Sequence, residues 1–81
     1  MVNKELFDFV KYVMETIKVD MEQAKITFFD DRRIVLFVDD RNKEYVIRTW
    51  NINKYCVRYS LFEMVGNHGV SIIDSQYYFF N

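Results

Sequence analysis

A change of hydrophobic period near Asp20 is the feature that most constrains the fold of this chain. Over residues 3–19, apolar residues recur at steps of three and four, so they share one face of an α-helix. The apolar face expected for this helix comprises Leu6, Phe9, Val10, Val13 and Ile17. After Asp20 the sequence instead contains short runs of β-branched and aromatic residues, which favour strands. The sequence therefore predicts one N-terminal amphipathic helix followed by a sheet.

Four strand-like runs follow this helix and are separated by short polar segments. They occupy residues 24–29, 34–38, 44–50 and 55–60. Connections this short join antiparallel neighbours, because a parallel pair needs a crossover of roughly a dozen residues. The predicted fold class is α+β, with the N-terminal amphipathic helix packed on an antiparallel β-meander of four to six strands. The length leaves room for a single compact domain, residues 1–81.

The C-terminal quarter of the chain admits two descriptions. Ser60 and Glu63 have the spacing of a capping box, which favours a helical turn over residues 60–65, although a strand fits the same residues. Residues 70–73 and 77–80 are predicted as two short strands with a tight connection between them. The order of these strands in the sheet stays open.

Two Asp-Asp-Arg clusters, at residues 30–32 and 39–41, raise the question of an acidic metal site. Their separation equals one strand plus one turn, so the two clusters are expected at opposite ends of the sheet. Each aspartate pair also adjoins an arginine whose charge competes with a cation, and neither cluster has the spacing of a calcium-binding loop. The sequence therefore predicts hairpin corners at both places and no metal site.

Composition restricts the compartment and the partners. The net charge of −1 lacks the basic excess of a dedicated nucleic-acid binder and the acidic excess of a polyanion mimic. No stretch approaches the ~18 apolar residues that a membrane span needs, and the first ten residues do not resemble a signal peptide. The single Cys56 cannot form an internal disulfide, which favours a reducing compartment. We therefore expect a soluble cytoplasmic protein that has no membrane partner.

The residues offer little support for catalysis. His68 is the only histidine, and Cys56 lies within a predicted strand between Tyr55 and Val57, whereas catalytic thiols usually lie in partly exposed, electropositive positions. One histidine and one cysteine are too few for a zinc site, which typically takes four ligands. No nucleotide-binding or metalloprotease motif occurs. The sequence predicts a protein that is not an enzyme and has no cofactor.

Nucleic-acid binding is the alternative function that the sequence leaves open. Cationic and aromatic residues interleave along two neighbouring strands, and exposed rings on a sheet can stack on bases of RNA or single-stranded DNA. These residues are Arg48, Trp50, Lys54, Tyr55, Arg58 and Tyr59. The strand order of the commonest RNA-binding sheet domain and its glycine-containing aromatic motif are both absent. The balanced net charge also makes this function second to protein binding.

An excess of apolar residues indicates a protein partner. Residues 34–38 are apolar at every position, which is typical of strands buried on both faces. One helix covers one face, so the C-terminal segment, a second copy of the chain or another protein is expected on the other. Aromatic residues and arginine are enriched in protein interfaces. The predicted interaction residues are Arg48, Trp50, Tyr55, Arg58, Tyr59, Tyr77 and Tyr78.

In size and composition the chain is similar to short accessory proteins of phages and other mobile elements. It is rich in Asn, Lys, Ile, Tyr and Phe, as AT-rich genes encode. This similarity implies a small protein that binds and inhibits or modulates a host or defence protein. The sequence therefore predicts a non-enzymatic protein–protein interaction module, acting on a protein partner or forming a homodimer.

Overall fold

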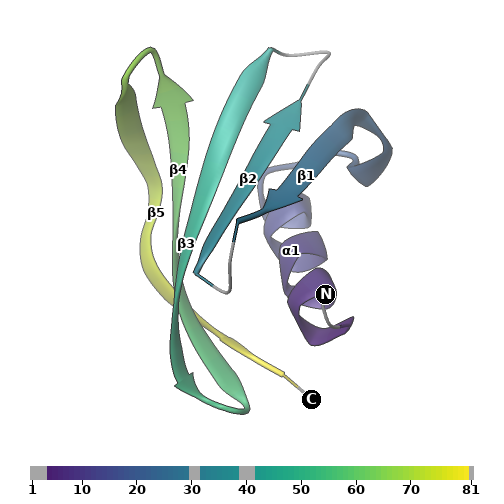
Figure 1. Ribbon diagram of the computed structural model, residues 1–81, viewed down its shortest axis with the longest axis vertical. Coiled ribbons are helices and arrows are strands. Elements are labelled where there is room, and N and C mark those ends of the chain that lie inside the picture. The colour runs from purple at the N-terminus through teal and green to yellow at the C-terminus, as the bar shows by residue number, and fades with distance from the viewer. Residues whose placement is uncertain (1–3, 30–31, 39–41, 81) are drawn as a thin grey trace.

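The computed structural model describes residues 4–29, 32–38 and 42–80. Its elements are the helix α1 (Lys4–Thr16), the 3-10 turn η1 (Met21–Gln23) and the strands β1 (Ala24–Phe28), β2 (Arg33–Val38), β3 (Lys43–Asn53), β4 (Cys56–Val65) and β5 (His68–Phe79). The five strands form one antiparallel sheet in the order β1-β2-β3-β4-β5 (Figure 1). The predicted fold class, a helix followed by an antiparallel meander, is confirmed.

α1 ends at a Schellman motif, which shortens it relative to the predicted 3–19. The Val19 amide donates to the Met14 carbonyl at 2.9 Å, and the Lys18 amide donates to the Glu15 carbonyl at 3.2 Å. Lys18 has a φ of 58°, the left-handed conformation that this cap requires. Val19 is buried beyond the cap, so the chain turns back towards the sheet at this point.

Local turn motifs determine the path of the chain at three connections that follow α1. The Asp20 carboxylate accepts a hydrogen bond from the Glu22 amide at 2.9 Å and so caps η1. Between β3 and β4, the Asn53 side chain accepts from the Tyr55 amide at 2.8 Å, as in an Asx turn. Between β4 and β5, Gly66 has a φ of 62°, which an L side chain rarely adopts. Each of these three connections therefore has a local cause in the sequence.

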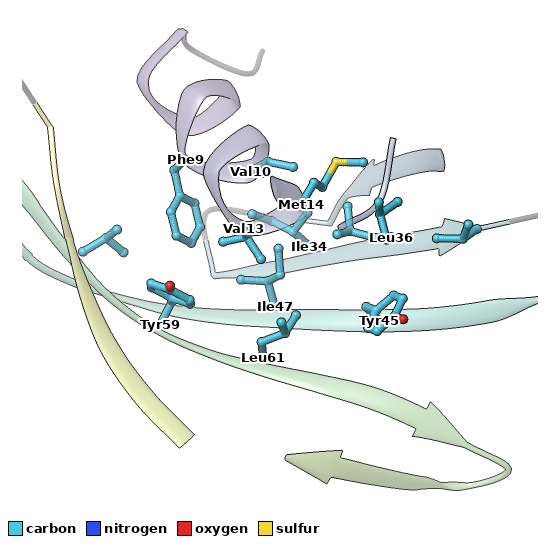
Figure 2. Packing of buried hydrophobic residues seen from close by; sticks show 13 residues of the cluster. Phe9, Val10, Val13, Met14, Ile34, Leu36, Tyr45, Ile47, Tyr59 and Leu61 are labelled. Carbon is cyan, nitrogen blue, oxygen red and sulfur yellow. The ribbon is translucent and has the colours of Figure 1, made fainter. Parts of the chain in front are cut away.

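The hydrophobic core lies between α1 and one face of the sheet. Figure 2 shows the buried side chains of α1 pointing onto residues of β2, β3 and β4. The fully buried members are Phe9, Val10, Val13 and Met14 from α1, and Ile34, Leu36, Ile47, Tyr59 and Leu61 from the sheet. Burying each such side chain contributes about 1.5–3 kcal/mol before the loss of chain entropy is counted. The helical period of the sequence thus located the core face of α1 correctly.

In the C-terminal quarter, the structure selects one of the two descriptions of residues 60–65 and differs from the prediction for the residues that follow. Residues 60–65 belong to β4 and do not form a helical turn, because they pair with β3 on one side and β5 on the other. The two predicted strands 70–73 and 77–80 are parts of one strand, β5. Register shifts between Tyr59 and Phe62 mark an irregularity opposite the segment that was expected to be a connection. There the Ser60 hydroxyl donates to the Asp74 carbonyl.

The hairpin corners expected at the two Asp-Asp-Arg clusters stay a prediction, because Asp30, Asp31 and residues 39–41 lie outside the described residues. Within the described part of the chain, no helix has the length and apolar character that crossing a membrane requires.

Candidate interaction surface

The sheet face opposite α1, called here the open face, is covered by no described element of the chain. α1 lies on one side of the sheet (Figure 1), and its buried side chains point onto the core face (Figure 2). The C-terminal segment does not fold over the open face as one expectation had it, because β5 extends the sheet at its edge. Strand register assigns to this face the positions that alternate with the core positions.

The centre of the open face is apolar. Val35 of β2 pairs with Val46 of β3, which pairs with Phe62 of β4, so these three side chains form one row across the sheet. In the next row, Phe37 and Met64 flank Glu44. Val46 is buried, while the other apolar members are half-buried without any helix above them. They leave a contiguous apolar surface accessible to a partner.

The charges of the open face are mainly positive. On β1 to β4, the positions on this face carry four cationic residues and one acidic residue, Glu44. The cationic ones are Lys25, Arg33, Arg48 and Arg58. Arg33 and Arg48 are direct cross-strand partners, so their Cβ atoms lie about 5 Å apart. The net charge of −1 for the whole chain therefore conceals a basic face.

A row of aromatic and cationic side chains crosses one end of the open face. Trp50 pairs with Arg58, and Arg58 pairs with Tyr77. The Arg58 guanidinium carbon lies 4.6 Å from the centre of the Trp50 ring, a distance that permits a cation–π interaction. Trp50 is 39% exposed and Tyr77 is 53% exposed. The row therefore presents two large rings, with Arg58 half-buried between them.

A hollow of about 370 Å³ opens at the other end of the same face. Its lining combines the apolar centre with both members of the cross-strand arginine pair. The lining residues are Arg33, Glu44, Val46, Arg48, Phe62, Met64 and Gly69. Gly69 has no side chain to project over Phe62 and Met64, so the hollow is open towards β5.

Four of the seven predicted interaction residues lie on the open face. Arg48, Trp50, Arg58 and Tyr77 occupy alternating positions on three adjacent strands. Tyr55 lies in the turn between β3 and β4, where its ring is 60% exposed and lies 4.9 Å from the Lys54 ammonium. It is accessible but does not belong to the same patch.

Tyr59 and Tyr78 belong to the other face of the sheet, so their assignment to an interaction surface is corrected. Tyr59 is 0% exposed, and its ring packs edge-on against Phe9 at a centroid distance of 5.0 Å. The centroid of the Tyr78 ring lies 5.4 Å from that of Phe9 and 5.0 Å from that of Tyr12. Each residue directly follows one that faces outward, Arg58 and Tyr77 respectively, and alternation along a strand turns it inward.

Burial also changes the acidity of Tyr59. Desolvation raises its pKa to about 12, and the nearby Tyr12 phenol adds to the shift. The phenol therefore stays neutral in the folded protein well above pH 10. It is a structural group of the core.

Sequence reasoning missed several residues of the open face. Phe62 and Met64 lie in the segment left open between a helical turn and a strand, and Arg33 and Gly69 were placed outside the predicted strands. The missed signal was the alternation within residues 59–64, where Tyr59 and Leu61 face the core while Phe62 and Met64 face outward. Apolar residues on both faces of this run favour a strand that is covered on both sides over a helical turn.

The residues considered for catalysis lie far apart. Cys56 begins β4 and pairs with Phe79, whereas His68 pairs with Val65 at the opposite end of the same hairpin. Nine residues of strand separate the two ends, or roughly 30 Å. Cys56 is buried. Among the described residues, no three His, Cys, Asp or Glu side chains are placed to hold a metal ion.

Comparisons with known proteins give no relative from which a function could be transferred. No known family model, curated protein or solved structure matches this chain. The function is therefore argued from the geometry of the open face.

Proposed function

We propose that this protein is a non-enzymatic protein-binding module that contacts its partner through the open face. The observation that carries the proposal is the one-sided cover of the sheet. α1 buries one face, while the other combines an apolar centre with exposed rings and arginines. Interfaces of stable complexes have this composition, with aromatic residues and arginine as frequent energetic centres.

The energetic argument concerns the half-buried apolar row. Phe37, Phe62 and Met64 keep part of their side-chain surface in contact with water in the isolated chain. Covering that surface with a partner is favourable by about 25 cal/mol per Å² of apolar area removed from water. The Trp50–Arg58 pair next to this row is held by strand pairing as well as by the ring contact, so it needs little ordering on binding.

We further propose that binding inhibits or modulates the partner. The support is the small size of the chain and a composition similar to that of phage and mobile-element accessory proteins. A small rigid sheet can block a surface of a larger protein by occupying it. On this proposal the partner is a host or defence protein in the cytoplasm, and the complex is stoichiometric.

Nucleic-acid binding is a second candidate because of one observation. The Trp50–Arg58–Tyr77 row places a cation between two exposed rings on an uncovered sheet face, an arrangement suited to stacking bases of single strands. Against it, the aliphatic Val35 and Val46 lie at the centre of the face and offer no stacking surface. The apolar centre favours a protein partner.

Affinity capture from a lysate of the source cell or its host tests the proposal. The bait is the full chain, and half of each sample is treated with nuclease. Two variants accompany the wild type: Trp50→Ala removes a ring from the open face, and Phe7→Ala removes a ring of similar exposure from α1. We expect one stoichiometric protein that survives nuclease, is lost with Trp50→Ala and is retained with Phe7→Ala.

Two other outcomes contradict the proposal. Retention of nucleic acid, or of proteins that nuclease releases, would indicate that the open face binds nucleic acid. The affinity for nucleic acid would then fall steeply with salt. A protein lost with Phe7→Ala and retained with Trp50→Ala would place the interface on α1.

A further inference from the structure

We infer that the hollow of the open face recognises an acidic side chain that lies next to an apolar side chain in a segment of the protein partner. This inference rests on the proposed function and adds the chemistry of the partner. The hollow has an apolar floor, a pair of arginines at one end and a wall without a side chain. Each of these three features restricts what can occupy it.

The floor selects an apolar group. Val46 and Phe62 are cross-strand partners in the middle of the sheet, and Met64 lies beside them on β4. These side chains make a surface that no described element covers. A hollow of about 370 Å³ is large enough for one side chain such as leucine together with a neighbouring polar group.

The arginine pair selects an anionic group. Arg33 and Arg48 are direct cross-strand partners, and like charges in this relation are unfavourable. The Arg33 guanidinium carbon also lies 4.9 Å from the centre of the Phe29 ring, and Arg48 is exposed. Arg48 lines the hollow beside Arg33, and its guanidinium can donate charge-assisted hydrogen bonds to a carboxylate bound there.

Glu44 gives the hollow a direction. It lies four residues from Arg48 on β3, a separation of roughly 13 Å along the strand. The positive end and the acidic end are therefore separated by the apolar floor around Val46. An extended segment binds with its acidic residue at the Arg48 end, and Glu44 disfavours a second acidic residue at the other end.

The same charges argue against a second copy of the chain as the occupant. If two open faces packed together, the basic residues of one copy would approach those of the other. Glu44 is the one acidic residue that β1 to β4 place on this face, against Lys25, Arg33, Arg48 and Arg58. Charge complementarity therefore favours a different protein that carries acidic residues.

An NMR titration of the full ¹⁵N-labelled chain tests the inference. The ligand is a tetrapeptide with blocked ends and the sequence Ala-Asp-Leu-Ala. We expect saturable shifts of the amide signals of Arg48, Phe62 and Gly69, with a dissociation constant of about 1 mM, as suits a few contacts. The isosteric peptide with asparagine in place of aspartate should bind about tenfold more weakly, because it lacks the charge-assisted bonds.

Two variants separate the charge from the shape of the hollow. Arg48→Gln should weaken binding of the aspartate peptide about tenfold, and Lys11→Gln, which changes an exposed cation on α1, should leave its affinity unchanged. Gly69→Leu should abolish binding by filling the hollow. A Cβ at Gly69 meets Phe62 and Met64 atoms at 3.6 Å, an ordinary contact, so the fold tolerates it. Ser71→Leu, one position further along this face of β5, is the matched control.

Three outcomes overturn the inference. The first is equal affinity for the aspartate and asparagine peptides. The second is the lack of any saturable shift of amide signals around the hollow. The third is that these signals shift on addition of an octamer of deoxythymidine but not of the peptide. The captured partner distinguishes this failure from failure of the proposed function. If the partner is lost with Trp50→Ala but retained with Gly69→Leu, the open face binds protein and the hollow is not used.

Discussion

At the scale of single residues, Tyr59 shows how burial fixes the chemistry of a side chain. Its pKa of about 12 in the folded protein compares with about 10 in an unfolded chain, chiefly because desolvation disfavours the phenolate. The stabilisation due to the neutral phenol is complete below pH 10. It is lost as the pH rises from 10 to 12, because only the unfolded state releases the proton in that interval.

We therefore predict that the free energy of unfolding falls more steeply between pH 10 and 12 in the wild type than in Tyr59→Phe. The difference should be about 1–2 kcal/mol at the alkaline end. Urea unfolding at a series of pH values measures it, and the variant serves as the control for the other tyrosines. Parallel pH profiles for the two proteins would mean that Tyr59 titrates normally.

Lys18 is a second residue whose conformation has an energetic consequence. It adopts a φ of 58° at the end of α1, where an L side chain is strained and glycine is not. Lys18→Gly should raise the free energy of unfolding by about 0.5–1 kcal/mol, net of the entropy that glycine loses on folding. Lys11→Gly, on the exposed side of the helix, should instead lower it by about 1 kcal/mol. Chemical denaturation gives both values, and destabilisation by Lys18→Gly would contradict the Schellman motif.

At the scale of elements, the stability of the fold depends on how α1 packs on the sheet. Val13 is fully buried in the centre of the helix face. Val13→Asp puts a charge where no water or partner solvates it, and the cost of at least about 4 kcal/mol is comparable with the stability of a small domain. We predict loss of the cooperative thermal transition. Lys11→Asp, two residues away on the exposed side, should retain it.

The elements also show which sequence signals can be trusted. The period of α1 predicted its core face, because this signal depends on local geometry alone. The capping-box spacing at Ser60 and Glu63 is a local signal too, and it left residues 60–65 open between a helical turn and a strand. These residues form a strand because they pair with both β3 and β5. Long-range pairing overrides such a local preference.

At the scale of the whole molecule, the apolar excess predicted that one side of the sheet needs cover beyond the N-terminal helix. No described element covers the open face, and a partner there stays a prediction. The membership of this face could be predicted only in part. Arg58 and Tyr59 were both assigned to it, although adjacent strand residues point to opposite faces. The hollow could not be predicted, because it requires the pairing of β2 with β3 and the position of Gly69 on β5.

The open face as the binding surface is the central claim, and side-chain footprinting with hydroxyl radicals tests it most directly. The chain is oxidised alone and in complex with the captured partner, and modification is quantified by mass spectrometry. We predict protection of Trp50 and Tyr77, with no change at Phe7, which is exposed on α1. Protection of Phe7 with unchanged oxidation of Trp50 and Tyr77 would contradict the account.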